Sequence, residues 1–262
     1  MIKVLFFGDI VGRIGRDYFL QQFPELKKKY KPDLIIVNGE NSANGKGITS
    51  KICSTYFNAG VTCITTGNHL FDNREIISNI DDFPALIRPL NYSPQVPGNT
   101  VFKTTINGIS VAVVNLLGQV FMPPIDNPFV AMENLLQDEL SDSQVIIADL
   151  HAEATSEKRA FGVNFAGRVS AVLGTHTHVQ TADAEIIDGH TGYLTDVGMV
   201  GAKNSILGME SEAIIRKFLT QMPERFAPPE ADSQMQMDFV YLEISATGQT
   251  TKIVSEHLVN TV

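Results

Sequence analysis

Four of the six histidines follow short apolar runs and stand beside other side chains that bind metals: His69, His151, His176 and His178. Imidazole is a good ligand for Zn, Fe, Ni and Cu, and carboxylate and amide oxygens suit Mn and Fe as well. Histidines gathered in this way indicate a metal centre. His190 and His257 lack such neighbours, so we expect them to be ordinary surface or core residues.

Oxygen ligands stand at the ends of other apolar runs. Two are carboxylates and two are amides: Asp9, Glu40, Asn41 and Asn68. The only two cysteines, Cys53 and Cys63, lie away from these residues, so a closed thiolate zinc site is not expected. We therefore expect neither thiol to take part in the chemistry.

The segment His176-Thr177-His178 places two histidines two residues apart. In an extended strand both rings would point to one face, which suits two neighbouring metal positions. The pair therefore favours a centre with more than one ion.

The apolar runs predict the strands that must position these residues. They are short, rich in β-branched and aliphatic side chains and bounded by turn residues, at 3–7, 34–37, 63–66, 111–114, 145–148 and 169–173. Amphipathic segments at 17–30 and 50–59 predict helices, and 239–244 with 251–257 predict a late hairpin. This alternation is typical of a layered α/β fold, in which ligands bind beyond the carboxyl ends of the strands.

The composition is that of a globular protein. The chain has 262 residues, of which 44% are hydrophobic, and we find no repeat or linker, so we predict a single domain over residues 1–262. The net charge of −9 argues against a broad electrostatic grip on nucleic acid or anionic lipid, so no stable nucleic-acid complex is expected. Bound cations would still allow an anionic substrate.

No apolar run approaches the roughly 18 to 20 residues that span a bilayer, so no membrane association is expected. The apolar start at 1–7 leads directly into Gly8-Asp9 without secretory features, which favours a first strand. Two cysteines are too few for a disulfide framework, and a cytoplasmic location is the natural expectation. The sequence leaves the oligomeric state open, with a homo-oligomer among the alternatives.

Plainer interpretations compete at several residues. Asp9 could cap the following helix, Glu40-Asn41 could form a turn, and Asn68 could be an Asx-turn residue. His69 could orient a ligand rather than donate a proton. Lys46, in the segment Gly45-Lys46-Gly47, is a candidate for substrate contact.

Three other segments have a nucleotide-related alternative. Gly8, Gly12 and Gly15 do not have the spacing of a dinucleotide-binding loop, and no Ser or Thr follows Lys46 as a P-loop requires. The apolar, proline-rich segment 121–129 is either a packed surface loop, a wall for a nucleobase or an oligomer contact.

The motifs together resemble those of a known family. Gly8-Asp9, Gly39-Glu40-Asn41, Gly67-Asn68-His69, His151 and Gly174-Thr175-His176-Thr177-His178 resemble the motif series of the calcineurin-like metallophosphoesterases. Longer strings at 8–13, 38–43, 88–92, 151–158 and 174–178 are similar to the YmdB-like subfamily. The resemblance runs from Asp9 to about Gly208 and is weak beyond it. It implies a four-layer α/β/β/α sandwich.

The resemblance also implies a dinuclear centre. One metal would be held by Asp9, Glu40, Asn41 and His178, and the other by Glu40, Asn68, His151 and His176. His69 would be the general acid. The broad superfamily has a histidine where this chain has Val11 and an aspartate where it has Glu40, and both departures match the YmdB-like subfamily. We expect two divalent ions, Fe or Mn, with Zn as an alternative.

The charge of such a centre suits a phosphodiester. Two divalent cations, two carboxylates and a bridging hydroxide leave a net charge of about +1, which complements one negative charge on the substrate. The resemblance implies hydrolysis of small phosphodiesters, cyclic nucleotides such as 2',3'-cyclic nucleotide monophosphates among them, by attack of that hydroxide. The alternatives are a phosphomonoesterase or nuclease, and a metal-binding regulator with incidental catalysis.

Overall fold

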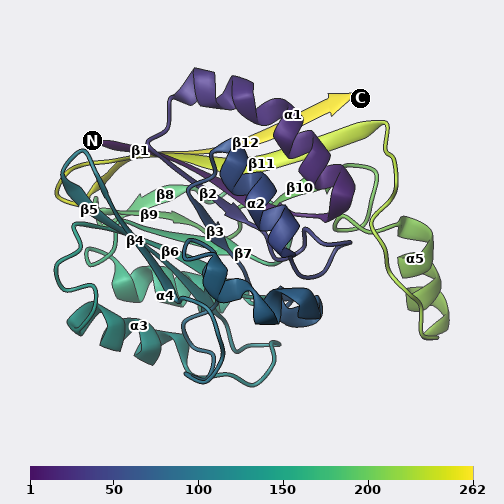
Figure 1. The fold of residues 1–262 in the computed structure, drawn as a ribbon, viewed down its shortest axis with the longest axis horizontal. Helices are drawn as coiled ribbons and strands as arrows, with labels where there is room; N and C mark the ends of the chain where they lie inside the picture. The colour runs from purple at the N-terminus through teal and green to yellow at the C-terminus, as the bar shows by residue number, and fades with distance from the viewer. Residues whose placement is uncertain (262) are drawn as a thin grey trace.

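The computed structural model describes residues 1–261, and it has two six-stranded sheets (Figure 1). The first sheet has the strand order β12-β11-β10-β1-β2-β3. Its members are β1 (Ile2–Ile10), β2 (Leu34–Asn38), β3 (Cys63–Thr65), β10 (Met199–Ala202), β11 (Gln234–Ile244) and β12 (Thr250–Thr261). The predicted hairpin is therefore the pair β11 and β12, at one edge of this sheet.

The second sheet has the order β4-β5-β6-β7-β9-β8. Its members are β4 (Val101–Ile106), β5 (Ile109–Leu117), β6 (Val145–His151), β7 (Ala171–Thr175), β8 (Glu185–Ile187) and β9 (Thr191–Leu194). The sequence predicted β5, β6 and β7 but not the short strands β4, β8, β9 and β10.

Helices cover the outer faces of both sheets. On the first sheet lie α1 (Gly12–Tyr30) and α2 (Ser50–Ala59), and on the second lie α3 (Pro128–Gln137) and α4 (Thr155–Phe165). Three 3-10 turns follow β3, namely η1 (Leu70–Asp72), η2 (Arg74–Ser78) and η3 (Ile80–Asp82), and α5 (Ser211–Thr220) stands at the side of the molecule (Figure 1). The predicted four-layer sandwich is confirmed.

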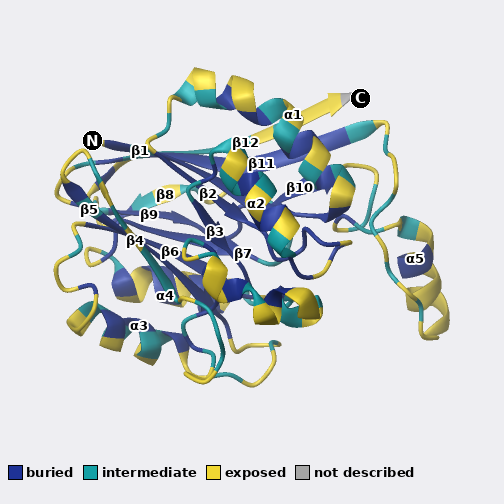
Figure 2. Ribbon diagram, viewed as in Figure 1, coloured by how far each residue is buried: buried dark blue, intermediate teal, exposed yellow. Residues whose placement is uncertain are grey.

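The alternation of side chains along β1 shows how the layers are held together. Val4 and Phe6 are buried in the same core cluster as Val113 of the other sheet, whereas Phe7 packs against Phe19 of α1. Both faces of this strand are therefore apolar, as the continuous run of hydrophobic residues predicted. Figure 2 shows that inner strands such as β1, β2, β6 and β7 are buried, whereas the edge strands β4, β8 and β12 and the outer faces of the helices are more exposed.

Parallel pairing brings the strand ends together. β1 pairs in parallel with β2 and β10, β2 with β3, and in the second sheet β5, β6 and β7 form a parallel series. The carboxyl ends of parallel strands lie at the same edge of a sheet, where ligands of α/β proteins bind. None of the helices within residues 1–261 is long and apolar enough to cross a membrane.

Candidate metal centre

The structure brings all seven predicted ligands and His69 to the carboxyl ends of strands in the two sheets. They come from five strand ends, those of β1, β2, β3, β6 and β7. Asp9, Glu40, Asn41 and His151 are buried, with at most 3% of their surface exposed. Because four polar side chains are buried side by side, they must satisfy one another or a common ligand.

One group of donors forms around Asp9. The amide nitrogen of Asn41 lies 3.1 Å from Asp9 Oδ1 and 3.1 Å from His178 Nε2. His178 Nε2 itself lies 3.7 Å from Asp9 Oδ1. A carboxylate, an amide and an imidazole thus converge on one point.

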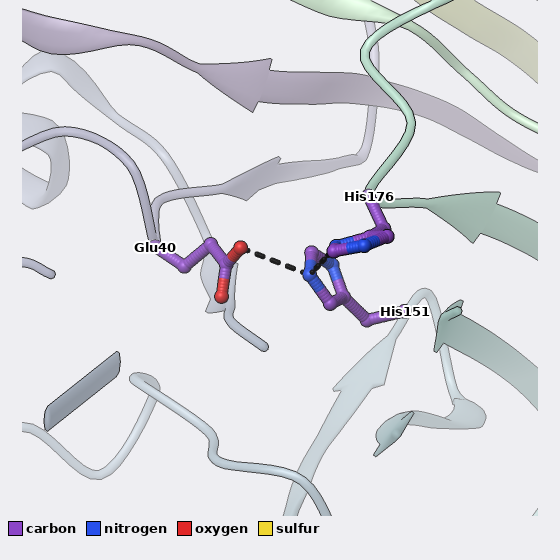
Figure 3. Close-up of side chains that lie close together, drawn as sticks. All are labelled: Glu40, His151 and His176. Carbon is purple, nitrogen blue, oxygen red and sulfur yellow. Dashed lines mark hydrogen bonds and ion pairs between the residues drawn. The ribbon is translucent and has the colours of Figure 1, made fainter. Parts of the chain in front are cut away.

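A second group forms around His151, and its Glu40, His151 and His176 are drawn in Figure 3. His151 Nε2 lies 2.9 Å from Glu40 Oε1, 3.1 Å from Asn68 Oδ1 and 3.0 Å from His176 Nδ1. A single N–H on that nitrogen cannot serve all three neighbours, whereas a cation among these lone pairs is satisfied by every one of them. The donor set therefore fits a metal ion.

Glu40 belongs to both groups. Its Oε1 also lies 3.2 Å from the amide nitrogen of Asn41, and its Oε2 accepts a 2.9 Å hydrogen bond from the backbone N–H of His69. Burial alone would raise the pKa of Glu40, but the neighbouring His151 outweighs it and lowers the pKa to about 2. Glu40 is therefore an anion placed between two sets of donors.

The charges of the two neighbouring imidazoles differ. Burial would lower the pKa of His151, but the Glu40 carboxylate, with Asp9 and Asp149, raises it to about 9. Burial and the adjacent His151 lower the pKa of His176 to about 3. The acids thus favour one positive charge in the cluster, and a metal cation can take the place of the His151 proton.

The orientation of the His151 ring is fixed by contacts of Nδ1, the ring nitrogen that does not face Glu40. Its Nδ1 lies 2.9 Å from the Thr175 hydroxyl, which donates a 2.7 Å hydrogen bond to Asp149 Oδ1. Because the hydroxyl has only one hydrogen, it accepts from the Nδ1–H of His151, which leaves Nε2 facing Glu40. Asp149 therefore acts on the cluster through Thr175.

Gly67 is required by the close approach of this cluster. A Cβ at this position would lie 2.4 Å from His151 Nε2 and 2.5 Å from Glu40 Oε2. Any side chain there would displace two of the predicted ligands. This explains the glycine directly before Asn68 and His69 in physical terms.

The predicted strand geometry of the histidine pair is wrong. β7 ends at Thr175, and His176 and His178 have φ angles of 102° and 62°. These residues therefore lie in a turn and not in an extended strand, which would have pointed both rings to one face. The rings instead diverge, with His176 beside His151 and His178 beside Asn41.

Glu153 and Lys158, for which we predicted no role, support this turn together with Asp196. Glu153 Oε2 lies 3.2 Å from His176 Nε2. The buried Lys158 donates a 2.7 Å hydrogen bond to Asp196 Oδ2, which also accepts from the backbone N–H of Thr177. Glu153 and Lys158 follow His151 closely in the string 151–158, and that proximity was the only sequence signal for them.

His69 lies next to the candidate metal centre and lines a cavity beside it. Its Nδ1 lies 2.9 Å from Asp72 Oδ2, and its side chain lines a cavity of about 820 Å³ together with Glu40, His176 and His178. With the backbone bound to Glu40 and one ring nitrogen beside Asp72, the other ring nitrogen is left for a ligand in the cavity. His69 is thus a candidate proton donor next to the cluster.

The structure decides between alternative interpretations of Asp9, of the glycines near β1 and of the loop 121–129. The helix that follows Asp9 is capped by Val11 without a side-chain hydrogen bond, so Asp9 is not its cap. Gly8 and Gly15 let β10 approach, since a Cβ at either would lie within 2.4 Å of a backbone oxygen, of Gly198 and Val200 respectively. The cavity is lined by Lys46 but by no residue of 121–129, so that loop is not its wall.

The comparisons with known proteins place this architecture in a family. A model of the family described as YmdB-like protein matches residues 5–255, so the resemblance extends well beyond Gly208, where the motifs had ended it. The 2',3'-cyclic-nucleotide 2'-phosphodiesterase of Bacillus subtilis is 47% identical over 97% of this chain and 94% of its own length.

Solved structures agree with this match. A phosphatase from Mycoplasma pneumoniae has a TM-score of 0.93 and 34% sequence identity, over 99% of this chain and 94% of its own. A putative 5'-nucleotidase from Staphylococcus aureus, 13% identical, shares the fold alone, with a TM-score of 0.61 over 98% of this chain and 54% of its own. The chain therefore belongs to the YmdB-like family, on a fold of the metallophosphoesterase type that binds divalent metal ions.

Proposed function

We propose that residues 1–262 act as one domain that hydrolyses small phosphodiesters, with 2',3'-cyclic nucleotide monophosphates as substrates. The observation that carries the proposal is the pair of donor groups sharing Glu40 at the end of a cavity of about 820 Å³. The cyclic-nucleotide specificity is supported by the activity named for the 47% identical Bacillus subtilis relative.

In this proposal the two donor groups hold two divalent ions, Fe or Mn, with Zn as the alternative. Asp9, Asn41 and His178 would hold the first, Asn68, His151 and His176 would hold the second, and Glu40 would serve both. Two divalent ions supply a hydroxide at neutral pH and neutralise the charge that develops on the phosphoryl oxygens. The neutral amides of Asn41 and Asn68 keep the total ligand charge low, which suits a substrate with one negative charge.

The side chains around the ions have separate tasks. His69 would protonate the leaving oxygen, with Asp72 on its other ring nitrogen orienting the ring. Thr175 and Glu153 hold the rings of His151 and His176. Lys46 lines the same cavity and is placed to attract an anionic substrate.

The test is a substrate panel with metal-replete protein. We expect 2',3'-cyclic AMP to be opened to a monophosphate without release of inorganic phosphate, and a chelator to abolish the activity. The His69→Ala variant should lose this turnover, whereas His190→Ala, which changes a histidine outside the centre, should retain it. Release of phosphate from a simple monoester at a higher rate would contradict the proposal and favour a phosphomonoesterase.

A further inference from the structure

The lining of the cavity has two unlike parts. One part holds the charged and imidazole side chains of the candidate metal centre. The other consists of six apolar side chains, which we call the α5 wall: Ile206, Leu207, Met209, Ile214, Phe218 and Phe226. Ligand sites in proteins are typically such apolar surfaces with a few polar groups that fix orientation.

The α5 wall is joined to the metal centre directly. The Leu207 carbonyl accepts a 2.9 Å hydrogen bond from Nδ1 of His178, whose other ring nitrogen lies beside Asn41. Farther along, the Met209 methyl packs against Gly45, where a Cβ would lie 2.6 Å from it. A ligand that reaches the metal centre therefore has this wall beside it.

Phe218 is the most open member of the wall. It lines the cavity with 81% of its surface exposed, whereas Ile214, one turn earlier on α5, is 8% exposed and anchors the helix. An aromatic ring left open to solvent at the edge of a cavity offers a flat apolar face to a ligand.

Phe226, another member of the α5 wall, is held in place by local contacts. Arg216 of α5 pairs with Glu224 at 3.2 Å, which draws the segment after the helix back onto it. The Lys217 ammonium then lies 5.0 Å from the ring centre of Phe226. These contacts set Phe226 in the wall and Lys217 beside it.

The charges of the cavity also point to its ligand. Lys46 and Lys217 both line it, and among the ion pairs of residues 1–261 neither ammonium is joined to a carboxylate. In a chain with a net charge of −9, two such lysines beside an apolar wall suit an anionic ligand with an aromatic body.

We propose that the α5 wall is a nucleobase subsite, with Phe218 stacking on the base of a nucleotide whose phosphodiester lies at the metal centre. This inference rests on the proposed phosphodiesterase function and adds that the protein recognises the base of the substrate. Stacking on an aromatic ring tolerates every base, because each base has a π-face. The subsite therefore selects nucleotides over other phosphodiesters without selecting strongly among bases.

The test compares two cyclic phosphates that differ in the base. The nucleotide 2',3'-cyclic AMP carries one, and glycerol 1,2-cyclic phosphate has only the ring phosphate. In the Phe218→Ala variant we expect the ratio of their kcat/KM values to fall by about tenfold, by the usual scale of base–aromatic stacking. The fall should come from weaker binding of the nucleotide, seen as an increase in its KM. Phe218→Tyr should restore the ratio.

Leu219→Ala is the matched control, because Leu219 is the next residue on α5, is 78% exposed and does not line the cavity. It should leave the ratio unchanged. An unchanged ratio in Phe218→Ala would overturn the subsite. The subsite would also be overturned if light scattering showed that both variants lose a homo-oligomer while both substrates are affected equally. In that case α5 would be an assembly surface. Failure of the wild type to hydrolyse either cyclic phosphate would instead overturn the proposed function itself.

Discussion

Glu153 Oε2 lies 3.2 Å from Nε2 of His176, on the ring nitrogen that faces away from His151. A carboxylate at this position accepts the Nε2–H, which fixes the tautomer that leaves Nδ1 free for a metal ion. The first prediction follows from this contact. Glu153→Ala should weaken metal binding by about 10- to 100-fold at one of two sites, measured by titration with a competing chelator. Glu139→Ala, which removes an exposed carboxylate from another surface, should bind metal like the wild type, and equal affinities in both variants would count against the assignment.

The second prediction concerns Glu40. Because its carboxylate touches both donor groups, Glu40→Ala should lose both ions, whereas Asn41→Ala should weaken one. Elemental analysis of the purified variants gives the number of ions per chain. Two ions retained by Glu40→Ala would show that the carboxylate is not shared.

The third prediction separates the chemistry of His69 from metal binding. The His69 ring lies beside Asp72 rather than in either donor group, so His69→Ala should keep nearly full metal occupancy. Turnover of a diester with an alkoxide leaving group should fall by about 10²- to 10⁴-fold, because the alkoxide needs a proton. A nitrophenolate leaves without one, so its ester should be much less affected. Equal losses for both esters would indicate a positioning role, and loss of an ion would make His69 a ligand.

A fourth prediction concerns stability. Lys158 is fully buried and its ammonium pairs with the buried Asp196, which holds the backbone of Thr177. Lys158→Met leaves Asp196 buried and unpaired, so the free energy of unfolding should fall by about 3 to 5 kcal/mol in urea denaturation. The neighbouring Arg159→Met removes an exposed pair with Glu185 and should cost at most about 1 kcal/mol. Similar losses in both variants would contradict this account.

The two thiols give the fifth prediction. Cys53 and Cys63 are buried, and burial raises the pKa of Cys53 to about 12 and that of Cys63 well above its usual value. The thiolate is the reactive form, so iodoacetamide should label neither residue in the folded protein at pH 8. Both should be labelled in denaturant. A doubly substituted Cys→Ala protein that folds and binds metal but has no phosphodiesterase turnover would show that a thiol is required after all.

The sequence predicted which residues of the candidate centre lie together, because each of them comes at or just after the end of a buried strand. Asp9, Glu40 and His151 each follow or end a continuous apolar run, and parallel strands bring such positions to one edge. That inference needs only the period of the hydrophobic residues and the rule for parallel sheets.

The turn at His176 and His178 could not be predicted in the same way. Both residues have positive φ angles, and the turn between them is held by Asp196, 19 residues beyond Thr177, which accepts the Thr177 N–H and pairs with Lys158. The cavity wall was missed for a related reason. We predicted no helix over 211–220, and nothing in the spacing of its apolar residues shows that Phe218 faces a cavity.

The position of β1 in its sheet has a consequence for synthesis of the protein. Residues Ile2 to Phe7 pair with Ile244 to Phe239, more than two hundred residues later in the chain. During translation the strand that carries Asp9 therefore leaves the ribosome long before its antiparallel neighbour exists. A nascent chain that stalls before β11 would therefore carry an exposed edge on the strand that leads to Asp9, although every predicted ligand up to His178 would already have been made.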